Sequence, residues 1–401
     1  MGGSTAKLIQ SMVSDYEQQA DGVKVSVTSK NSYRDVLNAT VSAVKAGKPP
    51  AVTQIFDIGT GLASQSGAFE TVEDIVPSAK LNKSGLIAPV RNFYTLDGTL
   101  HSMPFNSSNA ILYVNDDAFT KAGLDPSNPP KTYAELRSAA QTLVNTKTTE
   151  KGISFANHSW FVEQWFAEQN ETFVNEKNGR GGTPTKSHVD TPAGKATFDW
   201  WHGLYQDGLY LNPGVEAWSK ARQAFVSQKV GMLITSTSSV ASVTAGGKKQ
   251  GFDVTTAYLP VPKGKRNGVV VGGASLWVPK GLTNAQQKAA ADFIAWLSQP
   301  PQQVRWHENT GYFPVRKQSV NTLESNGWFE KHPNFKTAFD QLQATKDTPA
   351  TRGAVLGPFT KTRTIVEQAF VSTTQGTSVD SALSTAQSKI DEAIANYNKS
   401  N

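Results

Sequence analysis

Helix-like and strand-like segments alternate from the start of the chain, and this alternation restricts its fold more than any other feature. Apolar residues recur at helical spacing over residues 8–16, and valines alternate with other residues over 23–27, as they do in a strand. A second helical pattern over 33–46 leads to a short apolar run at 51–56. A helix that joins two strands is the unit of α/β folds, so the opening predicts an α/β protein.

Helical spacing and short apolar runs predict further helices and strands along the rest of the chain. The segment 175–191, rich in Gly, Lys and Thr, is predicted to be a loop, and the polar stretch 319–351 is predicted to carry one short helix near 335–342. Further helices are predicted at residues 133–144, 193–206, 284–298 and 378–397, and further strands at 110–114, 230–234 and 268–271.

Size and charge restrict the class of protein further. A chain of 401 residues exceeds the usual single core, so two domains or lobes are expected. No apolar run approaches the roughly 18 residues of a membrane span, and we expect a soluble protein. The net charge of +6 comes from scattered basic residues rather than one basic face, so nucleic acid is not an expected partner.

Motifs that would signal catalysis or metal binding are absent from the sequence. There is no Cys, and the six His show neither i, i+4 pairs nor acidic partners at metal-ligand spacing, so no metal or cofactor is expected. The segment 179–187 superficially resembles a phosphate loop, but Thr185 stands where Gly must precede Lys186. Paired carboxylates from distant strands keep a carbohydrate-active enzyme open as an alternative.

Four blocks of sequence carry a resemblance to a known family. They are residues 104–108 (PFNSS), 113–124 (YVNDDAFTKAGL), 272–278 (GGASLWV) and 310–316 (TGYFPVR). In order and over nearly the whole chain, they resemble the extracytoplasmic solute-binding proteins of ABC importers, most closely the glycerol-3-phosphate and glycerophosphodiester binders. Such proteins capture a ligand between two lobes and do no chemistry on it.

The resemblance implies an α/β, two-lobed periplasmic binding protein fold of the maltose-binding-protein type. The chain crosses between the lobes three times in that fold, so each lobe is discontinuous in sequence. The predicted first lobe is residues 1–109 with 260–311, the second lobe is 113–255 with 316–401, and the hinges lie near 108–113, 253–259 and 312–316.

The resemblance also assigns residues to a ligand phosphate. Arg363 corresponds to an Arg that grips the phosphate, although its pattern alone would make it a solvated Arg. Its replacement by Ala is expected to weaken phosphoester binding and to change the melting temperature of the ligand-free protein very little. Tyr33 and Tyr312 correspond to phenolic donors, and Gly273 to a backbone N–H that no side chain can block.

Two hydroxyls complete the predicted phosphate site. The apolar strand at 230–234 leads into a turn rich in Ser and Thr before a helix, a place where hydroxyls and free N–H groups bind anions. An ordinary helix cap would use the same groups. The resemblance assigns Ser236 in this turn, and Ser108 just before a crossing, as hydroxyl donors.

The predicted glycerol side of the site departs from the family in two places. Asp57 stands where the family usually has Glu, which is one methylene longer. Trp160 matches one of two aromatic rings that enclose glycerol, but Asn157 replaces the other. We therefore predict a wider pocket that prefers a diester such as glycerophosphocholine to glycerol 3-phosphate.

These residues predict the solute-binding component of an ABC importer, with no enzymatic activity. The expected ligand is a glycerol phosphoester, either a glycerophosphodiester or sn-glycerol 3-phosphate, and the expected partner is an ABC permease. The protein is expected to be a monomer, periplasmic or extracytoplasmic, free or lipid-anchored, with its export signal absent from this sequence. The nine Trp keep a maltose-like oligosaccharide binder as the main alternative.

Overall fold

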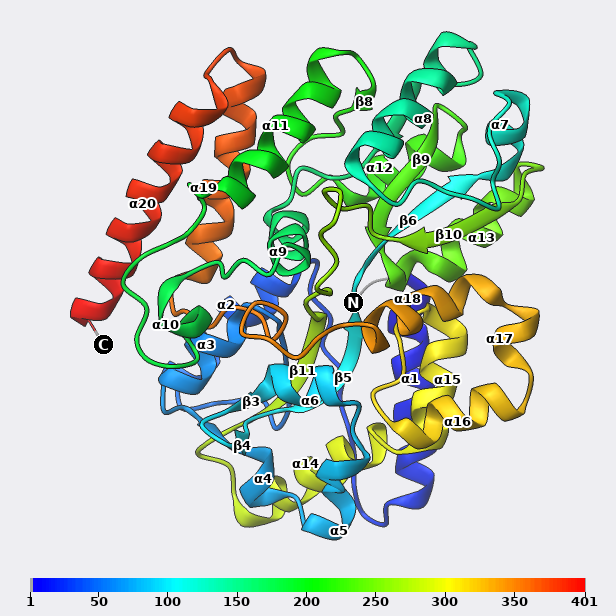
Figure 1. Ribbon diagram of the computed structural model, residues 1–401. Helices are drawn as coiled ribbons and strands as arrows, with labels where there is room; N and C mark the ends of the chain where they lie inside the picture. The colour runs from blue at the N-terminus through cyan, green and yellow to red at the C-terminus, as the bar shows by residue number, and fades with distance from the viewer. Residues whose placement is uncertain (1–2, 401) are drawn as a thin grey trace. The chain divides into compact units, whose positions relative to one another are not determined.

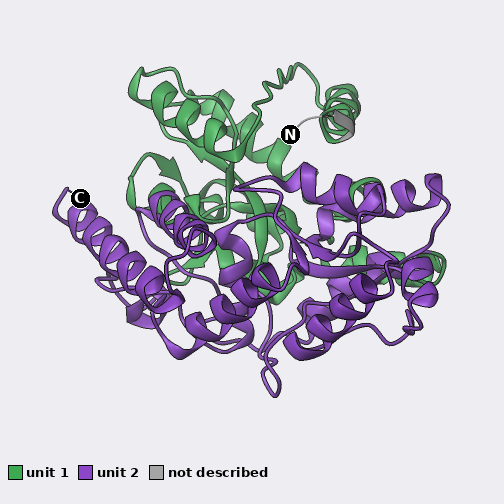
Figure 2. Cartoon of the chain, turned by 90° about the horizontal axis from the view of Figure 1, so that it is seen from above, with its two compact units in different colours: residues 1–107, 271–331 green, residues 108–270, 332–401 purple. Residues whose placement is uncertain are grey.

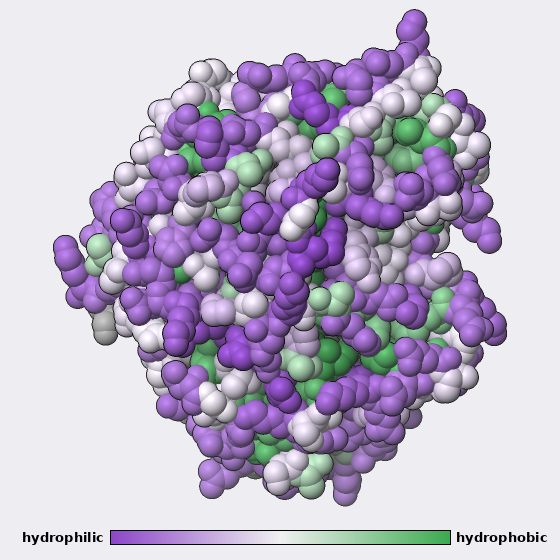
Figure 3. Space-filling view, viewed as in Figure 1, coloured by the Kyte–Doolittle hydropathy of each residue, from purple (hydrophilic) through white to green (hydrophobic). Residues whose placement is uncertain are grey.

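The computed structural model describes residues 3–400 and consists of two compact units, distinguished by colour in Figure 2. Unit 1 comprises Met1–Ser107 and Val271–Lys331, and unit 2 comprises Ser108–Val270 and His332–Asn401. The chain therefore passes from one unit to the other three times. Among residues 3–400, no helix has both the length and the apolar character that a membrane crossing needs, and the face in Figure 3 is largely hydrophilic.

Unit 1 is built around a four-stranded sheet with β11 at its centre (Figure 1). β11 pairs with β1, β2 and β5, and Phe56 of β1 lies opposite Ala274 of β11. The elements of unit 1 are α1 (Gly3–Gln19), α2 (Tyr33–Lys45), β1 (Thr53–Phe56), α3 (Gly59–Gln65), β2 (Phe69–Glu70), α4 (Val72–Ile75), α5 (Ser78–Leu81), η1 (Lys83–Gly85), α6 (Ala88–Tyr94), β3 (Thr95–Leu96), β4 (Thr99–Leu100), β5 (Met103–Ser108), β11 (Gly272–Pro279), α14 (Asn284–Leu297), α15 (Pro300–Thr310), α16 (Lys317–Ser325) and α17 (Trp328–Lys331).

Unit 2 contains a five-stranded sheet in the order β10, β6, β9, β7, β8. β9, β7 and β8 run parallel, whereas β10, β6 and β9 are joined antiparallel. The elements of unit 2 are β6 (Ala110–Asn115), α7 (Asp116–Lys121), α8 (Tyr133–Asn145), β7 (Lys151–Ser154), α9 (Ser159–Glu168), α10 (Asn175–Gly179), α11 (Pro192–Gln206), β8 (Tyr210–Leu211), α12 (Trp218–Val226), β9 (Val230–Ser236), η2 (Thr237–Ser239), α13 (Val240–Lys249), β10 (Val254–Tyr258), α18 (Pro333–Gln343), α19 (Phe359–Thr374) and α20 (Val379–Ser400).

Helix α9 is the buried centre of the helical part of unit 2. All ten of its residues are buried, including the polar Ser159, Glu163, Gln164 and Glu168. It packs against α11 and α19, and beside it the Trp201 ring of α11 stacks on Phe370 of α19 with centroids 3.6 Å apart. The packing of α19 on α9 brings together residues separated by about half of the sequence.

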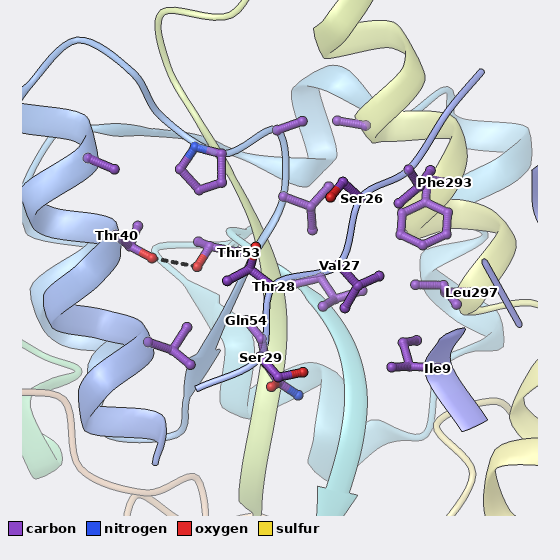
Figure 4. Close-up of a pocket in the computed structure, with 18 of the residues that line it drawn as sticks. Ile9, Ser26, Val27, Thr28, Ser29, Thr40, Thr53, Gln54, Phe293 and Leu297 are labelled. Atoms are coloured by element: carbon purple, nitrogen blue, oxygen red, sulfur yellow. Dashed lines mark hydrogen bonds between the residues drawn. The ribbon is translucent and has the colours of Figure 1, made fainter. Parts of the chain in front are cut away.

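The strand predicted at residues 23–27 does not form. The segment is extended but pairs with no strand of the described chain, and it runs along a cavity of about 690 Å³ between α2, β1 and α14 (Figure 4). One cause is local, because the Val25 N–H donates to the Glu17 carboxylate of α1 at 2.7 Å rather than to a neighbouring strand. Alternating valines alone do not distinguish a paired strand from an extended segment.

The strand predicted at residues 268–271 is also wrong, because the sheet begins only at Gly272. The backbone N–H of Gly268 donates to the Glu168 carboxylate at 3.0 Å, and that of Val269 donates to the Thr345 hydroxyl at 3.1 Å. Side-chain oxygens thus accept the backbone hydrogen bonds that a neighbouring strand would otherwise accept. In the stretch 319–351, where one short helix was predicted, the structure has most of α16 and all of α17 and α18.

The compact units differ from the predicted lobes in three segments, the first of which is residues 108–109, predicted in the first lobe but part of unit 2. Residues 260–270 belong to unit 2, where the bonds of Gly268 and Val269 hold them, and residues 316–331 belong to unit 1. Arg316 fixes the latter segment, since its guanidinium donates to the Ser298 hydroxyl at 2.8 Å and α16 packs on α15. The crossings therefore lie at residues 107/108, 270/271 and 331/332. Hinge motion at the crossings stays a prediction.

Candidate functional site

Two of the predicted phosphate ligands meet in unit 1. The hydroxyls of Tyr33 and Tyr312 lie 3.3 Å apart, and the amide of Asn106 donates to the Tyr33 hydroxyl at 2.8 Å. Tyr33 opens α2 directly after its N-cap Ser32, and Tyr312 follows α15, which ends at Gly311 in the left-handed conformation. Helix ends thus place two residues that are 279 positions apart in sequence.

Each of the two phenol rings stacks on another aromatic ring. Tyr33 stacks on Phe56 with centroids 5.7 Å apart, and Tyr312 stacks on Trp306 at 6.0 Å. Burial raises the pKa of Tyr33 well above its ordinary value, and the neighbouring Tyr312 raises it further. Tyr33 therefore keeps its proton and can donate a hydrogen bond to an anion.

Gly273 and Asp57 lie in the same part of unit 1. The Asp57 N–H donates to the Gly273 carbonyl at 3.0 Å, and the Asp57 carboxylate accepts from the Ile58 N–H at 2.9 Å. Gly273 has a φ of +98°, and a Cβ built there would lie 1.9 Å from the Asn106 carbonyl oxygen. Only glycine fits at this position.

We define the unit 1 group as Tyr33, Asp57, Asn106, Gly273 and Tyr312. Asn106 was missed by the sequence analysis, although it lies inside the PFNSS block that carried the resemblance. The side-chain oxygen Oδ1 of Asn106 accepts from the Gln54 amide at 2.6 Å, which fixes the orientation of the side-chain amide that donates to Tyr33. The group therefore contains a phenol pair, a buried carboxylate and a close backbone approach.

The sheet of unit 2 brings three other predicted residues to one edge. Ser154 of β7 pairs with Leu233 of β9 in parallel, so the carboxyl ends of both strands point to the same side of the sheet. Asn157 lies shortly after the end of β7, and Ser236 is the last residue of β9. Ser236 also pairs with Ala110 of β6, which places the preceding Ser108 at this edge. This is the edge of a parallel sheet at which ligands usually bind.

The hydroxyl of Ser236 caps the short helix η2. It accepts from the Ser238 N–H at 3.2 Å and lies 3.0 Å from the Ser238 hydroxyl. The ordinary capping role is therefore present in the structure. An anion would use the same N–H and hydroxyl groups, so a ligand role for Ser236 stays a prediction.

Trp160 and Asn157 are both buried, with exposed fractions of 5% and 1%. The Trp160 ring lies 5.9 Å from that of Trp218. The indole N–H of Trp160 and the amide oxygen of Asn157 have no hydrogen-bond partner among residues 3–400. Buried polar atoms without partners are uncommon and suit a place where a polar ligand binds. The Asn157 amide nitrogen donates to the Glu367 carbonyl at 3.2 Å, so Asn157 is held in the protein; the wider pocket stays a prediction.

Arg363 is not the solvated residue that its sequence pattern suggested. It is 5% exposed and forms a two-pronged ion pair with Glu163 of α9, with Nε to Oε1 at 2.8 Å and Nη2 to Oε2 at 2.7 Å. The Ser159 hydroxyl donates to the same carboxylate at 3.1 Å. We define the unit 2 group as Ser108, Asn157, Trp160, Glu163, Ser236 and Arg363.

Glu163 was missed by the sequence analysis, but a signal for it exists. It is a carboxylate in the middle of the run Trp160-Phe161-Val162-Glu163-Gln164-Trp165-Phe166, which is otherwise almost wholly apolar. A charge in a helix that is buried on all sides requires a buried partner of opposite charge. The identity of that partner depends on tertiary packing and cannot be obtained from the spacing of residues.

A second polar cluster lies beside Trp160. Candidate ligand atoms of His158, Glu216 and Glu367 all lie within 4.8 Å of one another, an arrangement that the spacing of His and acidic residues in the sequence did not indicate. His158 Nδ1 accepts from the Trp160 N–H at 3.0 Å, so a neutral His158 carries its hydrogen on Nε2. Neither ring nitrogen then offers a lone pair to a metal, and the cluster fits a metal centre poorly.

The cavity of Figure 4 does not coincide with the predicted site. Its lining in unit 1 includes Val27, Thr40, Thr53 and Phe293, and none of the nine residues predicted to bind ligand. The Thr40 and Thr53 hydroxyls are hydrogen-bonded at 2.6 Å across its wall. The cavity reflects the unpaired segment at residues 23–27, and each unit has its own group of candidate ligand-binding residues.

Comparison with known proteins gives consistent matches over most of the chain. The family model described as bacterial extracellular solute-binding protein matches residues 11–337. The sn-glycerol-3-phosphate-binding periplasmic protein UgpB of Agrobacterium fabrum is 30% identical over 376 residues, which cover 92% of this chain and 85% of the relative.

Solved structures share the fold at lower sequence identity. The GacH receptor of Streptomyces glaucescens, solved unliganded and with acarbose, has a TM-score of 0.83 at 17% identity and covers 98% of this chain and 96% of its own. UgpB of Mycobacterium tuberculosis in complex with glycerophosphocholine has a TM-score of 0.81 at 20% identity, covering 98% of this chain and 95% of its own. The predicted α/β periplasmic binding protein fold is thereby confirmed.

Proposed function

The chain belongs to the bacterial extracellular solute-binding protein family, and we propose that it binds a glycerol phosphoester for import by an ABC transporter. The observation that carries the proposal is the pairing of the Tyr33 and Tyr312 hydroxyls at 3.3 Å beside Gly273, where the resemblance to glycerol-phosphate binders requires them. A relative that is 30% identical over 92% of this chain is a glycerol-3-phosphate-binding protein, which supports the same ligand class.

Each group has a part in the proposed binding. In unit 1, the phenols and the Gly273 N–H donate to phosphate oxygens, and the Asp57 carboxylate accepts from glycerol hydroxyls. In unit 2, the hydroxyls of Ser108 and Ser236 and the indole N–H of Trp160 supply further donors. Many hydrogen-bond donors and one carboxylate acceptor on the protein suit an anionic ligand that also carries hydroxyl groups.

The biological setting follows from the family. Its members bind solutes rather than transform them, so this protein is not an enzyme. The relatives are periplasmic proteins. We propose that this protein works in the same compartment as a monomer, free or lipid-anchored, and that an ABC permease is its partner.

One observation favours a second candidate ligand. Arg363 is already neutralised by Glu163, and Glu216 and Glu367 lie near Trp160, so the unit 2 group does not present net positive charge. A neutral oligosaccharide, stacked on Trp160, would suit such surroundings. Maltose is therefore the competitor in the binding test.

We expect glycerol phosphoesters, and not maltose, to stabilise the ligand-free protein. At one hundred times its Kd, a ligand should raise the free energy of unfolding by about 2.7 kcal/mol, which a thermal shift measurement detects. Calorimetry then compares glycerophosphocholine with glycerol 3-phosphate, and we expect the diester to bind more tightly. Tight binding of maltose, with no response to either phosphoester, would contradict the proposed ligand class. Phosphorus NMR should show that the bound compound is returned intact.

A further inference from the structure

Glu163 occupies a position from which it controls the charge of the unit 2 group. It lies one helical turn after Trp160 on α9, and its carboxylate takes two of the five N–H donors of the Arg363 guanidinium. The pair is almost completely buried, with 6% of the Arg363 side chain and 9% of the Glu163 side chain exposed. The positive charge that a phosphate would meet is thus already balanced.

A second buried carboxylate belongs to the same surroundings. Glu367 follows Arg363 by four residues on α19, so both occupy one face of that helix. Ser159 links the two acids, because its N–H donates to Glu367 at 3.3 Å and its hydroxyl donates to Glu163 at 3.1 Å.

Two further titratable groups, His158 and Glu216, lie beside Glu367. The Nδ1 of His158 accepts a hydrogen bond from the Trp160 N–H at 3.0 Å, and Glu216 is exposed. The buried charges at this place are therefore the carboxylates of Glu163 and Glu367 and the guanidinium of Arg363.

An excess of negative charge discriminates between the two classes of glycerol phosphoester. A phosphodiester carries one negative charge, whereas a phosphomonoester approaches two at neutral pH because its second pKa is about 6. Each additional negative charge placed near buried carboxylates is unfavourable. The site can then accept hydrogen-bonded phosphate oxygens while penalising the dianion.

We propose that Glu163 is a selectivity-determining residue of the site, which makes it favour a phosphodiester monoanion over a phosphomonoester dianion. The inference rests on the proposed function, since it concerns phosphoesters in that same site. Glu163 acts through Arg363 as a positioning residue and through its own charge. A purely structural Glu163 would instead support both ligands equally.

The first test is the variant Glu163→Gln, which keeps the shape of the side chain and removes its charge. We expect the ratio of the Kd of glycerol 3-phosphate to that of glycerophosphocholine, measured by calorimetry at pH 8, to fall at least tenfold. Glu163→Asp keeps the charge and should restore the ratio towards that of the unaltered protein. Equal changes in both affinities would overturn the inference in favour of a structural role.

The matched control is Glu168→Gln. Glu168 lies on the same helix α9, is even more buried than Glu163 and is paired with another arginine, Arg266, at 3.2 Å. Its replacement should lower stability without changing the ratio of the two affinities. A similar change of ratio in both variants would show that any buried charge on α9 has this effect.

The second measurement needs no variant and remains decisive if Glu163→Gln does not fold. In the unaltered protein, glycerol 3-phosphate should bind more tightly as the pH falls from 8 to 5.5, because the dianion becomes a monoanion near pH 6. Glycerophosphocholine does not titrate in this range, so its own curve reports ionisation of the protein. Parallel curves for the two ligands would overturn the inference, whereas failure of both ligands to bind would instead refute the proposed function.

Discussion

Replacing Arg363 with Ala is expected to lower the free energy of unfolding by about 3–5 kcal/mol, besides weakening phosphoester binding by about 1.5–3 kcal/mol. The loss of stability arises because Glu163 would be left buried without the guanidinium that now binds both of its oxygens at 2.7 and 2.8 Å. Denaturant unfolding of the ligand-free variant measures the first effect, and calorimetry measures the second.

A double variant separates the two contributions. Changing Arg363 and Glu163 together to Gln removes both charges, so much of the lost stability should return while phosphoester binding stays weak. An Arg363→Ala variant whose unfolding midpoint equals that of the unaltered protein would show that the buried pair contributes nothing. That outcome would restore the sequence-based expectation of a solvated Arg363.

The substitution Gly273→Ala is expected to cost about 3 kcal/mol of stability and to abolish phosphoester binding. Part of the cost is the positive φ of +98°, which an L side chain adopts at about 1–3 kcal/mol. The rest is the contact of the new Cβ with the Asn106 carbonyl oxygen, 1.9 Å away. Because β5 pairs with β11, that carbonyl has little freedom to move, and its shift would disturb the amide that donates to Tyr33.

Gly281→Ala is the matched control for this prediction. Gly281 also has a positive φ, +87°, and follows the same strand, but no atom lies within 4 Å of its added Cβ. It should cost about 1–2 kcal/mol and leave ligand affinity unchanged. If both variants unfold at the same denaturant concentration, the close approach to Asn106 is not a significant restraint.

Local sequence patterns predicted some of the helices of this protein accurately, missed others such as α9 and α12, and predicted only part of its sheets. Helical spacing identified α2, α8, α11 and α14 to within two residues, because each has one apolar face that the pattern reveals. The segments 23–27 and 268–271 were predicted as strands and are not, since side chains of Glu17, Glu168 and Thr345 bind their backbone N–H groups. Partners so distant in sequence leave no periodic trace.

The candidate site shows the same division. The resemblance selected Tyr33, Tyr312 and Gly273, and the structure places them in one group of unit 1. It selected Arg363 as well, but gave no indication that Glu163, 200 residues away, shares its charge. Sequence motifs identify candidate ligand-binding residues. The charged partners of those residues depend on which helices pack together in the folded protein.

The order of the strands around β11 also has a consequence for how the protein is made. β1, β2 and β5 are synthesised within the first 108 residues, yet each pairs with β11 and, within residues 3–400, with no other strand. The ribosome must add more than 160 further residues before Gly272–Pro279 appears. At roughly 5–20 residues per second, the three early strands wait on the order of ten seconds or more for their common neighbour. Until the chain has grown past Pro279, the first sheet cannot close.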